Sequence, residues 1–219
     1  MGCYKDKRSL NLRVWHWLSA LAMFGLMATY LLRKTFLNYK ENAVIIQNKL
    51  AEIGVVVADD KAKEIAKVFR DNMWQWHYYI GFMFAALLAY RLWAFITHKD
   101  KFPTCKASWA VSELRKEQSA TPKKCLKEFV KVKYAHVIFY TVAIYEAISG
   151  LVMYFHEALG LQKESLHTIK ELHEWAFWFF ALFIVAHIIG VIKAEVTTDK
   201  GLISEMFNGG DEDKNSCGC

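Results

Sequence analysis

Five of the eight histidines lie inside long apolar stretches of the sequence, and they are the residues best suited to chemistry. They are His16, His77, His136, His173 and His187. An ionisable side chain is costly to place in an apolar environment, so each is a functional candidate, although any one of them could be a packing histidine with a hydrogen bond. Imidazole is a good ligand for iron and zinc, so the set as a whole predicts a metal or cofactor site.

Two of these histidines are spaced so that both could serve as ligands on the same face of one helix. His173 and His187 are 14 residues apart in the sequence, which corresponds to about 21 Å along a helix and to directions within about 40° of each other. Two ligands on one face, one toward each end of a membrane crossing, could hold two cofactors stacked across the membrane. The remaining histidines must then come from facing helices.

The stretches that contain the histidines are long enough to cross a membrane. Val14–Leu32 and Asn72–Tyr90 are each 19 residues without a charged side chain, Ala135–Phe155 has only Glu146, and Leu172–Ile192 is almost uncharged. A hydrocarbon core of about 30 Å needs about 20 helical residues. None of the four contains proline, and backbone groups in lipid must be paired within the segment, so all four should be helices.

The composition supports this interpretation. The mean hydropathy of +0.11 hides a segregation, because apolar residues gather in four blocks separated by charged segments. A soluble helix would carry an apolar stripe instead of being apolar all round. We therefore expect an all-α fold, an integral membrane four-helix bundle of up-down-up-down order in one domain, residues 1–219. The expected crossings are about 13–33, 73–97, 134–156 and 171–193.

The segments between the crossings should carry surface helices. In the outer loop, 34–72, apolar spacing predicts two short amphipathic helices, interrupted at Gly54 and restarted after Asp59 and Asp60. The basic loop 98–133 predicts a helical segment that attracts anionic lipid or an acidic patch on a partner, or else is a solvated loop. The tail is 194–219.

The charges predict how the chain is oriented. With both termini in the cytoplasm, 17 Lys and Arg lie inside and 10 outside, as the positive-inside rule requires. All five cysteines then lie in the reducing compartment. This orientation places His77 and His173 in the outer half of the membrane. The inner half contains three histidines, one more than a pair of ligands requires: His16, His136 and His187. Zinc needs three or four clustered ligands, so two separated pairs favour haem.

A family resemblance fits these features. The sequence resembles the prokaryotic di-haem cytochrome b561 superfamily, which includes the b-type cytochrome subunits of nickel-iron hydrogenases and formate dehydrogenases. The matching motifs are Arg13-Val14-Trp15-His16-Trp17, His77, Ser149-Gly150, the His173 and His187 spacing, and Gly201-Leu202-Ile203-Ser204-Glu205-Met206 with Gly209. The likeness covers the four crossings but not 40–72, 98–134 or the last ten residues.

The resemblance implies two haem b groups with paired histidine ligands. It implies His16 with His187 at the inner haem and His77 with His173 at the outer one, with His136 in place of His16 as the alternative. It also implies a quinone pocket near the start of the third crossing, where we expect Tyr134 and His136. No catalytic residue is expected.

Two charged residues inside the crossings also need a role. Arg91 lies 14 residues after His77, so it shares that helix face near the inner surface and could pair with a haem propionate, or else reach lipid phosphate. Glu146 could be protonated and hydrogen-bonded within the bundle, or relay a proton.

The expected function is electron transfer between a redox partner protein and the quinone pool, in a bacterial inner membrane. One alternative is a stand-alone oxidoreductase that oxidises superoxide or another donor and reduces quinone. Another is a haem-free membrane transporter or scaffold.

Overall fold

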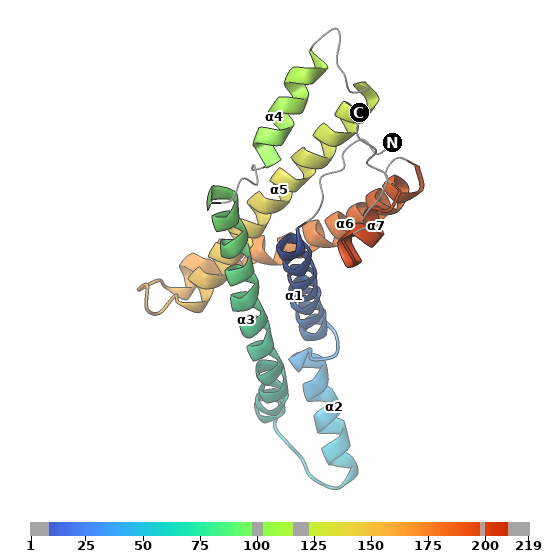
Figure 1. Cartoon of the computed structure of the whole chain (residues 1–219). Coiled ribbons are helices and arrows are strands. Elements are labelled where there is room, and N and C mark those ends of the chain that lie inside the picture. Colours follow the sequence, from blue (N-terminus) through green and yellow to red (C-terminus); the bar gives the residue numbers. More distant parts are fainter. Residues whose placement is uncertain (1–8, 98–102, 116–122, 198–199, 210–219) are drawn as a thin grey trace. The chain divides into compact units, whose positions relative to one another are not determined.

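The computed structural model describes residues 9–97, 103–115, 123–197 and 200–209 (Figure 1). Its elements are α1 (Leu10–Lys34), α2 (Tyr39–Glu52), α3 (Asp59–Thr97), α4 (Pro103–Leu114), α5 (Lys123–Tyr154), the short 3-10 helix η1 (Lys163–Leu166), α6 (His167–Thr197) and α7 (Leu202–Phe207). No strand occurs among these residues, which confirms the all-α fold class. Cys217 and Cys219 lie outside the described residues.

Four of the helices are long and apolar enough to cross a membrane, so the chain is a multi-pass membrane protein. These segments are Leu10–Lys34, Asp59–Thr97, Leu126–Tyr154 and Glu164–Thr197. Each of the four expected crossings falls on one of these segments. The expected third crossing, 134–156, extends just beyond Tyr154, the last residue of α5. Large apolar side chains such as Leu21, Leu182 and Ile189 are exposed along these helices, as a lipid-facing surface requires.

The helices form two compact units, and each is described by itself. One unit is Leu18–Leu87, which holds most of α1, all of α2 and the larger part of α3. The other unit comprises Met1–Trp17 and Leu88–Cys219. Its described part holds the start of α1, the end of α3, and α4 to α7.

In the Leu18–Leu87 unit, small residues bring α1 close to α3. A Cβ atom added to Gly25 would lie 3.1 Å from Cδ1 of Ile80, and one added to Gly81 would lie 3.9 Å from Cδ2 of Leu26. Small residues let helix backbones approach where lipid supplies no hydrophobic drive for association. Gly25 therefore serves close helix packing, whereas a Cβ at Gly81 would make an ordinary van der Waals contact.

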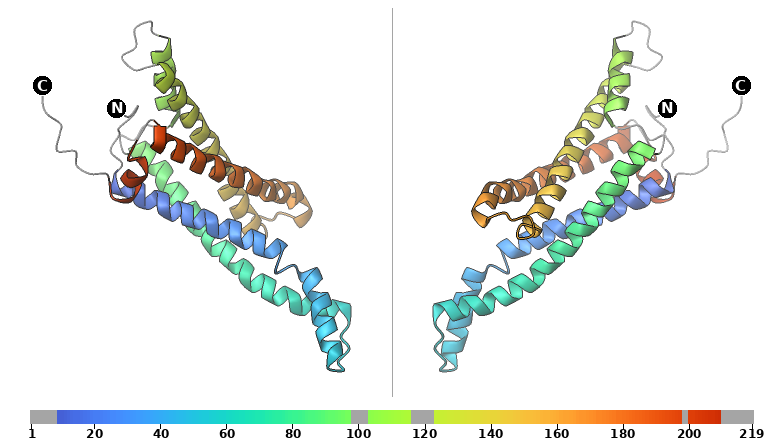
Figure 2. Two further views of the ribbon diagram at one scale, coloured as in Figure 1. Left: turned by 90° about the vertical axis from the view of Figure 1, so that its right-hand side faces the viewer. Right: turned by 90° about the vertical axis from the view of Figure 1, so that its left-hand side faces the viewer.

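Beyond this contact, α2 folds back along the start of α3, and we call this pair the α2–α3 hairpin (Figure 2). Its core is three buried alanines, Ala43, Ala62 and Ala66, with Tyr39, Ile46 and Val57 packed against them. The side chain of Asn38 caps α2 by accepting a hydrogen bond from the backbone N–H of Lys40, and Gly54, with φ of +80°, allows the turn after α2.

One detail of the predicted outer loop is wrong. The segment that begins at Asp59 is not a separate short helix, because α3 runs without interruption from Asp59 to Thr97. No proline or glycine stands between Asp59 and Ile80, so nothing in the sequence ends the helix before the apolar stretch begins.

In the other unit, α5 packs against both α4 and α6. Ala110 of α4 and Leu126 of α5 are fully buried. Phe139 of α5 lies 4.8 Å from Phe183 of α6, measured between ring centroids. The hydroxyl of Tyr145 donates to the carbonyl oxygen of Ile169 at 3.5 Å. The basic loop thus contributes a helical segment, as expected, with residues 98–102 and 116–122 outside the described part.

Hydrogen bonds join the short helix α7 to α6 and to the start of α1. The carboxylate of Glu195 accepts hydrogen bonds from the backbone N–H groups of Gly201, at 2.8 Å, and Ile203, at 2.9 Å. The indole N–H of Trp17 donates to the carbonyl oxygen of Met206 at 3.1 Å. Gly209 has φ of +91°, and a Cβ there would lie 2.7 Å from Nη1 of Arg13. These contacts explain the glycines of the C-terminal motif.

The alanine core of the α2–α3 hairpin gives a first prediction. Ala62→Leu overfills a fully buried position, which should destabilise the hairpin by about 1–3 kcal/mol. We expect faster protease cleavage between α2 and α3 in the detergent-solubilised protein. Val56→Leu, at a position that is 93% exposed, is the control and should leave cleavage unchanged. If the protease cleaves Ala62→Leu and Val56→Leu at the same rate, the three alanines do not form the packed core of the hairpin.

Candidate cofactor site

The structure brings two of the expected ligands together. His16 lies in the second turn of α1, and His187 lies in the C-terminal half of α6. The centroids of their imidazole rings are 6.2 Å apart, with an angle of 49° between the ring planes. Both residues belong to the same compact unit.

This separation fits one metal ion held between two imidazole rings. A metal–nitrogen bond of about 2.0 Å, plus about 1.1 Å from the nitrogen to the ring centre, places two rings that bind from opposite sides about 6.2 Å apart. The observed centroid separation of 6.2 Å equals that value. Among the described residues no group of three or more His, Cys, Asp or Glu could hold a metal, so a zinc-type cluster is not found there.

Two aromatic rings contact this histidine pair. Phe183 stacks on His187, with ring centroids 6.1 Å apart and an angle of 9° between the planes. Trp17 meets His16 edge to face at 5.5 Å. Such surroundings lower the local dielectric and limit solvent access, two factors that tune a metal site.

On α6, His173 is held by two side chains of α5. Its Nδ1 lies 2.8 Å from Oγ of Ser149 and 3.1 Å from Oε2 of Glu146. A Cβ added to Gly150 would lie 3.5 Å from Cε1 of His173. Ser149 therefore has a physical role, because its hydroxyl bonds the ring, while a Cβ at Gly150 would make an ordinary van der Waals contact with it.

In the Leu18–Leu87 unit, His77 has a similar arrangement. Its Nδ1 lies 2.8 Å from Oγ1 of Thr29 on α1. The ring of Trp74 stacks on the imidazole, with centroids 4.2 Å apart and an angle of 6° between the planes. The guanidinium carbon of Arg33 lies 4.1 Å from the centroid of the Trp74 ring. This stack fixes the plane of the His77 ring.

Both hydroxyl partners favour the tautomer with the proton on Nδ1. The hydroxyl of Thr29 donates to the carbonyl oxygen of Leu26 at 2.8 Å, and that of Ser149 donates to the carbonyl oxygen of Glu146 at 3.2 Å. Because each hydroxyl proton is used in this way, each oxygen accepts from the N–H of its histidine. The Nε2 of His77 and of His173 is then the unprotonated ring nitrogen, which is the form of the nitrogen that can bind a metal.

The other predicted site residues on α5 lie near the start of the third crossing. The Nδ1 of His136 lies 2.6 Å from the carbonyl oxygen of Val132, one turn earlier. Tyr134 is 53% exposed. The ring that lies 6.2 Å from that of His187 is that of His16. The choice between His16 and His136 as the inner ligand stays a prediction.

The guanidinium of Arg91 lies among aromatic rings. Its central carbon is 4.4 Å from the centroid of Phe95 and 5.4 Å from that of Trp15, and it hydrogen-bonds to Tyr140. Trp15 directly precedes His16 in the sequence, and Arg91 belongs to the same compact unit as the histidine pair. The expectation that Arg91 extends to lipid phosphate is less well supported than a role inside the unit.

Thr29 and Trp74 are site residues that sequence analysis missed, and the contact of Glu146 with His173 was missed as well. A single hydroxyl in an apolar helix gives no signal by itself. The spacing of Glu146 and Ser149, three residues apart on one face of α5, is the one signal that could have indicated a shared target.

Taken together, four helices long and apolar enough to cross a membrane, and histidines held by side chains of neighbouring helices, define a multi-pass membrane protein with a candidate cofactor site. A comparison with known families identifies it further: the chain belongs to the prokaryotic cytochrome b561 family, whose model matches residues 7–209. The protein is therefore a membrane b-type cytochrome that binds haem b and acts in electron transfer. Neither the curated proteins nor the solved structures contain a match to it.

The hydrogen bond from His77 to Thr29 gives a second prediction. Thr29→Val removes the acceptor of the Nδ1 proton while keeping the side-chain shape, which should weaken cofactor binding about 10–100-fold. Competition with a haem-scavenging protein measures this as faster loss of haem. Thr35→Val is the matched control, because Thr35 directly follows α1 and its hydroxyl donates to the carbonyl oxygen of Leu31. Equal haem loss from the two variants would refute the role of Thr29.

Proposed function

We propose that the protein is a di-haem electron conduit, which passes electrons between a partner redox protein and the quinone pool. The observation that carries this proposal is the 6.2 Å separation of the His16 and His187 rings. It occurs in a chain that belongs to a b-type cytochrome family. Haem iron supplies one-electron transfer by changing between its ferric and ferrous states.

In this proposal each haem takes two histidines. His16 and His187 hold the inner haem, and His77 and His173 hold the outer one. The support for the second pair is the shared hydrogen-bond pattern, since Thr29 and Ser149 each orient a histidine with Nε2 available as ligand. With both axial positions taken by the protein, the site is suited to electron transfer and not to binding oxygen.

Three further side chains serve the inner half of the protein. Arg91, held by Phe95, Trp15 and Tyr140, supplies a positive charge for a propionate of the inner haem. Tyr134 and His136 line the quinone pocket at the start of the third crossing. The bond of His136 to Val132 fixes its ring, which suits a residue that meets a quinone carbonyl.

We place the protein in the bacterial inner membrane with both termini in the cytoplasm. The support is the charge asymmetry, with 17 Lys and Arg in the segments placed inside and 10 in those placed outside. The α2–α3 hairpin and the His77 site then face the outer side. The basic segment around α4 faces the anionic inner leaflet.

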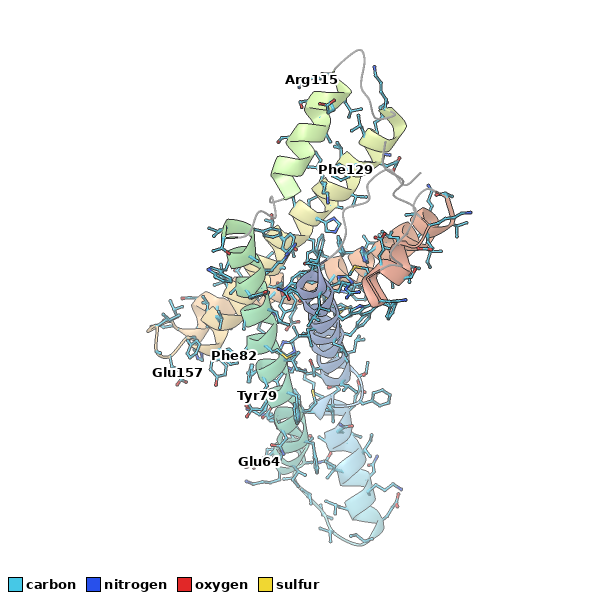
Figure 3. All side chains as sticks on the ribbon, in the orientation of Figure 1. Glu64, Tyr79, Phe82, Arg115, Phe129 and Glu157 are labelled. Carbon is cyan, nitrogen blue, oxygen red and sulfur yellow. The ribbon has the colours of Figure 1, made fainter. Side chains whose placement is uncertain are left out.

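The redox partner is proposed to bind the α2–α3 hairpin. Ile65, Val68 and Phe69 form an apolar stripe on α3 with i, i+3 and i+4 spacing, and all three are exposed. Glu64, labelled in Figure 3, lies beside this stripe on α3. A grouped apolar surface of this kind is typical of a protein interface.

The ligand assignment gives a third prediction, tested by the haem-to-protein ratio of the purified protein. His77→Ala or His173→Ala should lower the ratio from about two to about one and keep the inner haem, because each removes an axial ligand of the outer haem. His16→Ala or His187→Ala should remove the inner haem instead.

The control for this series is His167→Ala, a histidine at the first residue of α6 that is not assigned to a haem. It should keep both haems. If His136→Ala loses a haem while His16→Ala retains both haems, His136 and not His16 is the ligand of the inner haem. A purified protein without the absorption bands of b-type haem would refute the whole proposal.

The proposed interface gives a fourth prediction. Phe69→Glu places a charge on the apolar stripe, so a partner redox protein should no longer co-purify in mild detergent, while haem content stays the same. Glu64→Gln, at an exposed position on the same helix, is the control and should keep the partner. If the wild-type protein purifies alone and reduces quinone with a small donor, the stand-alone oxidoreductase is correct instead.

A further inference from the structure

We infer that Arg33 binds a propionate group of the outer haem. This inference rests on the proposed function, in which His77 is an axial ligand of that haem. A haem propionate is a carboxylate, and the planar guanidinium of arginine binds carboxylates through two parallel hydrogen bonds. Arg33 thus adds a binding site for an anionic group to the site that holds the ligand.

Three residues of the Leu18–Leu87 unit form a series of contacts. The guanidinium carbon of Arg33, in the last turn of α1, lies 4.1 Å from the centroid of the Trp74 ring. Trp74 stacks on His77, with ring centroids 4.2 Å apart and an angle of 6° between the planes. One aromatic ring therefore contacts both the positive charge and the imidazole that we propose as a haem ligand.

The burial of Arg33 distinguishes it from a side chain that only reaches lipid phosphate or water. A long cation at the end of a membrane crossing normally extends to the aqueous interface. Arg33 is instead half-buried, whereas Lys34, the next residue, is exposed. The helix dipole favours a cation in the last turn of α1, but this effect applies to both residues and does not draw Arg33 onto Trp74.

The other compact unit contains a related arrangement. There the guanidinium carbon of Arg91, on α3, lies 5.4 Å from the ring centroid of Trp15, on α1. Trp15 directly precedes the proposed ligand His16 in the sequence. In the Leu18–Leu87 unit the arginine comes from α1 and the tryptophan from α3. The pairing of arginine with tryptophan thus occurs in both units with the helices exchanged, so it does not follow from the local sequence of one helix.

A positive charge at a propionate has two effects that can be measured. It forms charge-assisted hydrogen bonds to the carboxylate, so its removal should weaken retention of the haem. It also favours the ferrous state, which carries one positive charge fewer than the ferric state, so its removal should make the reduction potential more negative. Arg33 should therefore make the outer haem easier to reduce and slower to dissociate.

The experiment combines a potentiometric redox titration of the purified membrane protein, followed by haem absorption, with the rate of haem loss to a haem-scavenging protein. Arg33→Gln should make the potential of one haem more negative, leave that of the other unchanged, and speed loss of the affected haem about 10–100-fold. Arg33→Lys keeps the charge but not the guanidinium fork. Its potential should stay near that of the wild type, and its rate of haem loss should be intermediate.

Two backgrounds identify the haem that Arg33 affects. His187→Ala should retain the outer haem alone, and adding Arg33→Gln there should shift its potential. His77→Ala should retain the inner haem alone, and adding Arg33→Gln there should shift nothing. A shift confined to the inner haem would overturn the inference.

Lys67→Gln is the matched control. Lys67 is an exposed cation of the same unit that also lies over an aromatic ring, 5.3 Å from the centroid of Tyr39. It stands seven residues before Trp74 on α3, which is about 10 Å along the helix. Both potentials and the rate of haem loss should stay unchanged. An equal shift in Lys67→Gln and Arg33→Gln would overturn the inference, because any positive charge of the unit would then suffice.

Electron paramagnetic resonance of the ferric haems tests for an indirect effect through Trp74, because its signal reports the orientation of the axial imidazole. Arg33→Gln should leave the signal unchanged, since Thr29 still bonds to His77. A changed signal would overturn the inference, as would unchanged potentials in Arg33→Gln. If Arg33→Gln loses the outer haem entirely, Arg33→Lys must retain it, and loss from both variants would count against the inference.

These outcomes separate the inference from the proposed function. Two haems in the wild type with no effect of Arg33→Gln would overturn the inference alone. A wild-type protein without haem would overturn the proposed function and the inference with it.

Discussion

The structure depends on orienting imidazole rings inside an apolar environment. A ring that binds a metal through Nε2 must donate its Nδ1 proton to an acceptor, and in a membrane that acceptor has to come from the protein. Thr29 serves His77, and Ser149 with Glu146 serves His173. Each hydroxyl in turn donates to a carbonyl oxygen of its own helix, so a neighbouring helix favours the Nδ1–H tautomer of His77 and of His173.

This requirement explains why the ligands lie on long helices that are apolar all round. A helix satisfies its own backbone groups, so the few polar side chains in the crossings can be used for the ligands. Close approach of the helices is then needed to bring donor and acceptor within 3 Å. Gly25 permits it between α1 and α3, because a Cβ there would lie 3.1 Å from Cδ1 of Ile80.

The sequence was sufficient to predict features that depend on one segment, but not those that depend on how two helices face each other. Uncharged runs of 19 residues predicted helices that the structure shows to be long and apolar enough to cross a membrane. The two ligand sites on α6, which the 14-residue spacing suggests, stay a prediction. The contacts of Thr29 and Glu146 depend on the rotation of one helix against its neighbour, which no local pattern specifies. The continuity of α3 was missed because the charged residues after Asp59 resemble a surface helix.

The end of the chain is tied to the same site by the residues that flank His16. Arg13 lies one turn before it, within hydrogen-bonding distance of the carbonyl oxygen of Phe207 at 3.4 Å, and Trp17 directly follows it, bonding to Met206 and packing on Phe207 with ring centroids 4.6 Å apart. Movement of α7 would therefore be transmitted to the first turns of α1. The position of His16 relative to His187 depends on both ends of the chain being in place.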